Sequence, residues 1–277
     1  MTSSKICAKH LSRRDEQRMN AMKSAQPGTL AASFHDTLAT VAQQHQVVEA
    51  RLGLGYMAVV LNNGAVGLAY TFRHETNASC TAFEGLDGIA GCSALRLLGM
   101  LGSADRLEAG LGLATVNALT QHEPREELCG DIVELLDLRA SDHVGMVGHF
   151  APVALRLAER VKELTVFERI DAPTATMRPA AEAAATLPHC DIALITATTL
   201  INHSIDELLS AAQHCREVVI LGASTPLSPL LFAGTPVTML SGVQVRDTAA
   251  LLRVISEGGG MRRFSRHVAK LGVRLSA

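Results

Sequence analysis

The second half of the chain alternates short apolar runs with longer segments of helical spacing. The apolar runs, which read as strands, are VGMVG (144–148), LTVFER (164–169), DIALITATTL (191–200), EVVILGAS (217–224) and TPVTML (235–240). Helical spacing is found between and after them, at 151–162, 204–213, 246–259 and, as a final expected helix, the terminal FSRHVAKLGVRL. Apolar strands separated by helices are typical of a parallel sheet covered by helices on both faces. The pattern predicts an α/β domain over residues 140–277.

The first half has a different pattern. Residues 29–45 carry apolar positions at helical spacing, and three short apolar runs follow, at 47–53, 56–64 and 65–72. Asn63-Gly64 separates two of these runs, which is a strong hairpin signal. Two more helices are expected at 91–101 and 103–121, and Ser103 is a suitable cap for the second. These elements predict a small α+β domain over residues 28–125.

Composition and charge narrow the class of partner. The formal net charge is −2 and aromatic residues make up 3% of the chain, which argues against a nucleic-acid partner. Residues 1–27 carry six Lys or Arg against Asp15 and Glu16, and we expect a disordered basic tail there. No run of about 18 apolar residues is present, so no membrane-spanning helix is expected. The six cysteines form no C-x-x-C pair, which favours free thiols in a cytoplasmic protein.

Polar residues follow the predicted strands at one edge of the sheet. In open parallel sheets, ligands bind beyond the carboxyl ends of the strands, where the strand order reverses. Hydroxyls, amides and glycines there suit hydrogen bonding to a polar small molecule. The candidate ligand-binding residues at this edge are Gly148, Glu168, Thr196, Thr198, Thr199, Asn202, Gly222, Ser224 and Thr225. For the threonines, the alternative is that their hydroxyls only satisfy the backbone at a strand end.

The stretch HVGMVGHFAPVALRL has the outline of a strand, a glycine turn and a helix, as in nucleotide-binding units. Its glycines stand as Gly145-x-x-Gly148 and not as G-x-G-x-x-G, which speaks against ordinary dinucleotide binding. Glu168 nevertheless ends the next predicted strand, where an acid commonly binds the ribose hydroxyls of an adenosine-containing cofactor. The alternative is that Glu168 is a solvated acid at a strand end.

Two histidines are candidate metal ligands. His149 and His203 both follow predicted strands at the ligand edge, so we consider them for a divalent metal ion or for acid–base work. Neither forms a Cys/His pair at zinc-finger spacing, and a lone loop histidine is more often a solvated side chain.

Several segments, in order, resemble one known family. HVGMVGHFAPVALRL, LTVFER, LPHCDIALITATTLINHSIDELL, VVILGASTPLSPLLFAGTPVTMLSGVQVRD and EGGGMRRF are similar to the C-terminal domain of the heavy-metal-chelation family. GLGYMAVVLNNGAVGLAYTF and LATVNAL resemble the smaller domain that precedes it. The family combines an enolase N-terminal-like domain with a Rossmann-like domain, and a cleft forms between them.

The resemblance also implies where a site would lie. It points to the loop after VGMVG, to Glu168, to TTLIN and to GAST, with Tyr70, Thr71 and Asn117 as partners from the smaller domain. His149 stands where the family more usually has an aromatic residue, which puts a shared role for its ring in doubt. The enolase likeness does not imply enolase chemistry, because no barrel with metal-binding carboxylates fits after residue 140.

Three functions therefore stay open. The first is a cytoplasmic protein that binds a metal or a metal chelate in the interdomain cleft. The second is an enzyme that uses S-adenosylmethionine or NAD bound through Glu168, with His149 or Asn202 near the reacting group. The third is a small-molecule sensor or scaffold without catalysis. Folds of this kind often form homodimers, but no residue pattern decides the oligomeric state.

Overall fold

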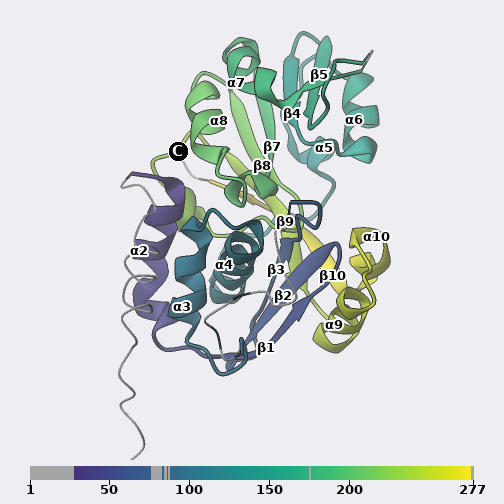
Figure 1. Cartoon of the computed structure of the whole chain (residues 1–277). Helices are drawn as coiled ribbons and strands as arrows, with labels where there is room; N and C mark the ends of the chain where they lie inside the picture. Colours follow the sequence, from purple (N-terminus) through teal and green to yellow (C-terminus); the bar gives the residue numbers. More distant parts are fainter. Residues whose placement is uncertain (1–27, 76–82, 84–85, 87, 175, 276–277) are drawn as a thin grey trace, which may run out of the picture.

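Two β-sheets, each with its own helices, make up the protein (Figure 1). The computed structural model describes residues 28–75, 83, 86, 88–174 and 176–275. The expected basic tail, residues 1–27, lies outside the described residues. Among the helices that are described, none has the length and apolar character needed to cross a membrane.

The larger sheet has seven strands and is mostly parallel. Its strands are β4 (His143–Val147), β5 (Glu163–Glu168), β6 (Met177–Pro179), β7 (Ile192–Thr196), β8 (Glu217–Leu221), β9 (Met239–Val245) and β10 (Val268–Arg274). They lie in the order β10-β9-β8-β7-β4-β5-β6, and only β10 runs antiparallel to its neighbour. The order reverses between β4 and β7, which places the topological switch point there. The predicted mixed α/β architecture with a parallel sheet is confirmed.

Helices cover both faces of this sheet because its central strands are apolar on both sides. Ile192 and Leu194 of β7 pack with α5 (Ile132–Leu135) and α6 (Ala151–Ala158), whereas Ala193 and Ile195 belong to the core on the opposite face. The helices of that second face are α7 (Ala183–Thr186) and α8 (Ile205–Ala211), with the short 3-10 helices η2 (Ala180–Glu182), η3 (Leu187–His189) and η4 (Ala197–Leu200) beside them. Alternate residues of one strand thus stabilise two separate layers.

The smaller sheet is an antiparallel meander of β1 (Val47–Leu52), β2 (Tyr56–Leu61) and β3 (Val66–Tyr70). The turn between β2 and β3 contains Gly64 at φ +82°, as the Asn63-Gly64 signal predicts. One face packs against α2 (Leu30–Ala42), α3 (Ala94–Leu98), η1 (Gly99–Gly102) and α4 (Arg106–Leu119). The other face packs against α9 (Thr248–Ser256) and α10 (Met261–Phe264), which come from the far end of the chain (Figure 1).

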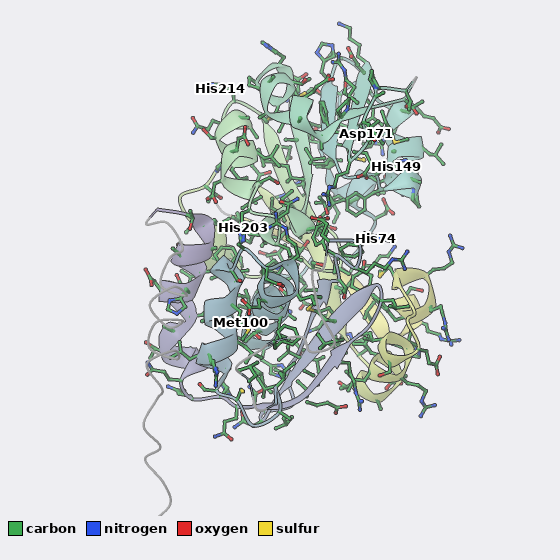
Figure 2. All side chains as sticks on the ribbon, in the orientation of Figure 1. His74, Met100, His149, Asp171, His203 and His214 are labelled. Atoms are coloured by element: carbon green, nitrogen blue, oxygen red, sulfur yellow. The ribbon has the colours of Figure 1, made fainter. Side chains whose placement is uncertain are left out.

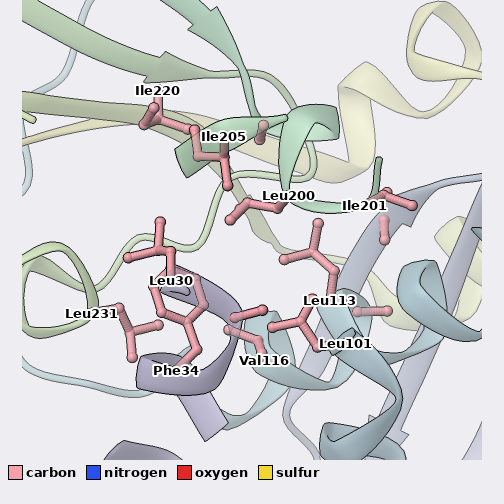
Figure 3. Close-up of a cluster of buried hydrophobic side chains, with 14 of the residues drawn as sticks. Leu30, Phe34, Leu101, Leu113, Val116, Leu200, Ile201, Ile205, Ile220 and Leu231 are labelled. Atoms are coloured by element: carbon pink, nitrogen blue, oxygen red, sulfur yellow. The ribbon is translucent and has the colours of Figure 1, made fainter. Parts of the chain in front are cut away.

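A continuous apolar core joins the two sheets. Figure 3 shows Leu30 and Phe34 of α2 and Leu113 of α4 close to Leu200 and Ile205 of the larger sheet's layer. The 3-10 helix η5 (Pro229–Phe232) closes this core, and the rings of Phe34 and Phe232 meet edge to face at 5.2 Å. The division into two domains, at residues 28–125 and 140–277, stays a prediction. Helix α9 belongs to the second of these ranges but packs against β1 and β2 of the first.

Several details of the sequence prediction are wrong. Of the strand expected at 191–200, only Ile192–Thr196 forms β7, and Ala197–Leu200 form η4. The terminal segment expected to be a helix forms η6 (Ser265–His267) and strand β10, which pairs with all of β9. The helix-like spacing of Val268 and Leu271 is overridden by this long-range pairing. The strand expected at 235–240 lies instead at 239–245, because Met239 pairs with Val219 of β8. The cap of α4 is Asp105, whose side chain accepts hydrogen bonds from two backbone amides, and not Ser103.

The buried carboxylate of Asp142 lies directly before β4, the first strand of the larger sheet along the chain. Asp142 is 1% exposed, and its Oδ2 accepts hydrogen bonds from the Arg139 amide at 2.8 Å and the Arg216 guanidinium at 2.7 Å. Burial alone would raise the pKa of Asp142. The hydrogen bonds from Arg216 and Arg139, together with the charges of both guanidinium groups, outweigh burial and lower this pKa. The ionised carboxylate therefore stabilises the fold.

Replacing Asp142 with asparagine is expected to lower the free energy of unfolding by about 2 kcal/mol at pH 7. A lowered folded-state pKa contributes stability above the unfolded-state value of 3.8, and that contribution is lost as the pH falls through the folded-state pKa. The difference between the parent and Asp142→Asn should therefore be constant from pH 7 to 5 and shrink below 3.8. Urea unfolding at each pH measures it, and a difference of the same size at pH 3 would contradict the assignment.

Candidate functional site

A pocket of about 360 Å³ lies at the carboxyl edge of the larger sheet, on the side toward the smaller sheet. Its volume is in the range of small-molecule sites. The residues that line it come from β2, from α5 and the loop before it, from the start of α6, from the ends of β7 and β8 and the segments that follow them, and from β9, α10 and β10. They are Tyr56, Gly130, Asp131, Ile132, Phe150, Pro152, Val153, Thr196, Ala197, Thr198, Leu221, Gly222, Ala223, Ser224, Ser241, Gly242, Val243, Met261, Lys270 and Leu271.

Two glycines with positive φ lie at the carboxyl edge of the larger sheet, and one of them, Gly222, lines the pocket. Gly148 (φ +87°) follows β4, and Gly222 (φ +119°) follows β8. A Cβ on Gly222 would stand 3.6 Å from the ring of Phe150, so this ring lies directly against the β8 turn. A Cβ on Gly148 would meet Thr196 at 3.0 Å. Both turns therefore favour glycine because of their positive φ, and at Gly148 the close approach of Thr196 adds to this.

Hydroxyl groups at the end of β7 form a small network. Thr196 caps η4, and its Oγ1 lies 3.0 Å from Oγ1 of Thr198. Both threonines line the pocket. Thr199 is 2% exposed and donates its hydroxyl to the Thr196 carbonyl at 2.7 Å, and it is not part of the lining. Thr196 and Thr198 thus face the pocket, whereas Thr199 bonds to the backbone.

The loop after β8 is fastened to the smaller sheet. Ser224, which lines the pocket, accepts a hydrogen bond from the Tyr70 amide at 2.9 Å through its Oγ. The side-chain amide of Asn117 donates to the carbonyls of Leu68 at 2.6 Å and Ser224 at 3.0 Å. Thr225 is buried beside this contact and does not line the pocket. Tyr70 of β3 and Asn117 of α4 therefore position one wall of the pocket.

Glu168 lies away from the pocket lining. Its Oε2 accepts a hydrogen bond from the backbone amide of His149 at 3.0 Å, and its Oε1 accepts one from the amide of Arg169 at 2.8 Å. The carboxylate therefore closes the turn after β4. A ribose would have to share these oxygens with two backbone amides, and binding of an adenosine-containing cofactor through Glu168 stays a prediction.

The two candidate metal ligands are on different parts of the molecule. His149 and His203 are exposed and lie well apart, as their labels in Figure 2 show. The ring of His203 is 2.7 Å from the carbonyl of Ser103, a contact between the two halves of the chain. Asn202 accepts two hydrogen bonds from Ser204. Within the described ranges, no three His, Cys, Asp or Glu side chains gather so that they could hold a metal ion.

Gly145 lies inside β4 and not in the turn. A Cβ there would stand 2.7 Å from Leu187 and 3.1 Å from the sulfur of Cys190. The first glycine of the Gly145-x-x-Gly148 pair thus allows the layer of α7 and η3 to pack closely on the strand. Only Gly148 lies at the ligand edge of the sheet.

Several residues that line the pocket could not be predicted from any sequence motif around them. Tyr56 reaches the pocket from β2, and burial together with the neighbouring Tyr70 raises the pKa of Tyr56 to about 12, so its phenol is neutral at physiological pH. Its ring meets those of Tyr70 and Phe264 edge to face. Lys270 of β10 is exposed and makes no ion pair with a described residue, whereas Asp131 is paired with Arg156 at 2.7 Å. The pocket therefore offers one unpaired cation among its described residues.

Two family models match the chain, and both carry the description "Putative heavy-metal chelation". The first covers residues 131–273, which is more than half of the chain, and the second covers residues 35–120. An uncharacterised protein of Methanocaldococcus jannaschii is 30% identical over 156 residues, which span 54% of this chain and 60% of that protein. The match thus spans less than two thirds of the relative.

Solved structures share the fold. A protein of unknown function from the DUF364 family of Pyrococcus horikoshii matches with a TM-score of 0.79 and 24% identity, over 89% of this chain and all of that one. A second DUF364 protein, from Desulfitobacterium hafniense, matches with a TM-score of 0.72 and 22% identity, over 95% of this chain and all of that one. The two family models and these folds agree, and the chain belongs to the heavy-metal-chelation family known as DUF364.

Proposed function

We propose that the pocket at the carboxyl edge of the larger sheet binds a metal chelate, a small organic anion that carries a metal ion. The observation that carries this proposal is the lining of the pocket, which combines apolar walls, five hydroxyl-bearing residues and one unpaired lysine. Ile132, Phe150 and Val153 supply apolar contact for the organic part of a ligand. Small-molecule sites typically combine such walls with a few polar groups that orient the ligand.

The metal in this proposal is held mainly by the chelator. The one lining carboxylate, Asp131, is paired with Arg156. The hydroxyls of Thr196, Thr198, Ser224 and Ser241 also line the pocket, and they are weak metal ligands beside thiolate, imidazole or carboxylate. They suit hydrogen bonds to the oxygen atoms of a chelator. His149 and His203 lie outside the lining and have no part in the proposal. The family description supports the metal, and the pocket lining supports its organic carrier.

The domain assignment belongs to the same proposal. Residues 28–125 form an enolase N-terminal-like domain and residues 140–277 a Rossmann-like domain, with the pocket between them. The strand order β6-β5-β4-β7-β8-β9 supports the Rossmann-like part, because it is the order of doubly wound nucleotide-binding sheets.

Replacing Lys270 with glutamine is expected to weaken binding of an anionic chelate about fivefold, close to 1 kcal/mol, because the lysine is exposed and its charge is screened. Titration calorimetry with the substitution-inert Co(III)–EDTA anion measures this. An inert complex is chosen because protein side chains cannot displace its ligands. The matched control is Lys162→Gln, an exposed lysine just before β5. Equal affinities for the two variants would contradict a role for Lys270.

The proposal as a whole is tested by native mass spectrometry of the gently purified protein, before and after treatment with a strong chelator. We expect an added mass that contains both an organic molecule and a metal, in a ratio of one to one. An adenosine-type mass that survives the chelator would favour the cofactor enzyme instead. A metal increment without any organic mass would contradict the chelate.

A further inference from the structure

Two His-Cys dipeptides stand at matching places in the larger sheet. His189-Cys190 comes just before β7, and His214-Cys215 comes just before β8. The two strands are parallel neighbours in which Ile192 is paired with Glu217. Each cysteine therefore lies two residues before one member of this pair. The topology therefore brings Cys190 and Cys215 side by side at the amino edge of the sheet.

Backbone and side-chain contacts hold the two cysteines close together. The Arg216 amide donates to the Asp191 carbonyl at 2.7 Å, which joins the residues that directly follow the two cysteines. The carbonyl of Leu187 accepts from the Cys190 amide at 3.0 Å and from the Cys215 thiol at 3.6 Å. The Cys190 thiol donates to the neighbouring carbonyl of Thr186 at 3.6 Å. Both sulfurs thus meet at the same turn, and both side chains are half-buried and free.

We propose that Cys190 and Cys215 form a two-thiolate site for a soft metal ion that accepts two ligands, such as Cu⁺ or Hg²⁺. Thiolate sulfur selects soft metals over hard ones. The reaction is balanced without an oxidant, because each of the two thiols loses a proton and forms one metal–sulfur bond. A pair of sulfurs is enough for such an ion, which distinguishes this site from the three-ligand clusters of harder metals.

Burial and nearby carboxylates keep both thiols protonated in the metal-free protein. Burial, together with the carboxylates of Asp191 and Glu163, raises the pKa of Cys190 to about 11. Burial, with Cys190 and Asp191 nearby, raises the pKa of Cys215 to about 12. Protonated thiols of this kind are poor nucleophiles, which argues against a redox or catalytic pair. The nearby Arg216 guanidinium is bound to Asp142, and the acidic groups Asp191 and Glu163 attract a metal ion.

This site is separate from the pocket proposed above and does not depend on it. His214, the neighbour of Cys215, lies at the edge of the larger sheet that faces away from the smaller sheet (Figure 2). The pocket lies at the opposite, carboxyl edge. A soft metal bound at the cysteines would therefore leave the pocket open.

Mercuric ion in the presence of excess glutathione tests the proposal, because a single thiol cannot hold Hg²⁺ against that competitor whereas a preformed pair can. The protein for this test has Cys7, Cys80, Cys92 and Cys129 replaced by serine. Native mass spectrometry should show one mercury per chain with the loss of two protons. Either Cys190→Ser or Cys215→Ser should reduce retention at least 100-fold.

Matched variants of the natural chain keep the test valid if the serine-substituted protein does not fold. There, Cys190→Ser and Cys215→Ser should each lose the retained mercury, whereas Cys92→Ser should keep it. Retention that is unchanged by both substitutions would overturn the proposal. So would a mass two units lower with no metal and two fewer free thiols, because that result identifies a disulfide.

Discussion

Replacing Gly67 with alanine is expected to lower the free energy of unfolding by about 3 kcal/mol or more. Gly67 lies in β3, and a Cβ there would stand 2.0 Å from the carbonyl oxygen of Ala114 and 2.2 Å from the amide nitrogen of Ala118. Both atoms belong to the backbone of α4, which cannot rotate away as a side chain does. The strand and the helix would have to separate, which would expose the core between them.

Urea unfolding measures this effect, with Gly55→Ala as the matched control. Gly55 lies in the neighbouring turn between β1 and β2, and a Cβ there would meet nothing closer than 3.8 Å. We expect the control to change stability by less than about 0.5 kcal/mol. Equal losses for the two variants would mean that the close approach of β3 and α4 does not limit the fold. Because β3 also positions Ser224 through Tyr70, Gly67→Ala should weaken ligand binding as well.

Replacing Val153 with tryptophan is expected to weaken chelate binding at least 100-fold, about 2.7 kcal/mol. Val153 is half-buried on α6 and lines the pocket, so an indole at this position would occupy the space that a ligand needs. The natural chain contains no tryptophan, so the new indole also reports its own surroundings. Its fluorescence should be blue-shifted if the side chain enters the pocket.

Leu155→Trp is the matched control, because Leu155 lies on the same helix, is 71% exposed and does not line the pocket. Its fluorescence should be that of a solvated indole, and its affinity for Co(III)–EDTA should stay within a factor of two of the parent. Calorimetry of both variants measures the effect. If Val153→Trp bound the chelate as tightly as Leu155→Trp, the pocket would not be the binding site.

The sequence predicts much of the fold because its signals are local. The parallel strands β4, β5, β7 and β8 are apolar runs separated by helices, and the hairpin has an Asn-Gly turn. The elements it misses depend on distant pairing. Strand β10 forms because β9 needs a partner, and β6 is only three residues long at the edge of the sheet. Neither feature can be read from the spacing of apolar residues nearby.

The candidate site shows the same limit. Thr196, Thr198, Gly222 and Ser224 lie in the last residues of predicted strands, and all four line the pocket. Tyr56, Asp131, Met261 and Lys270 also line it, but they come from segments that only the tertiary fold brings together. Lys270 in particular lies in a segment whose spacing predicts a helix, so its place beside Val243 of β9 follows from strand pairing alone.

Glu168 illustrates a different kind of limit. Its position at the end of the second parallel strand is correctly read from the sequence. The sequence does not show which groups donate hydrogen bonds to its carboxylate. In the structure these donors are the backbone amides of His149 and Arg169. An acid at a strand end can bind a ligand or close a turn, and the backbone geometry of the next loop determines which of these occurs.

The most direct test of the central claim is a crystal structure with bound Co(III)–EDTA, in which anomalous scattering locates the cobalt. The proposal predicts a single cobalt peak inside the pocket, with the chelate oxygens near the hydroxyls of Thr196 and Ser224 and the charge of Lys270. A cobalt peak beside Glu168 and His149, with the pocket empty, would contradict it.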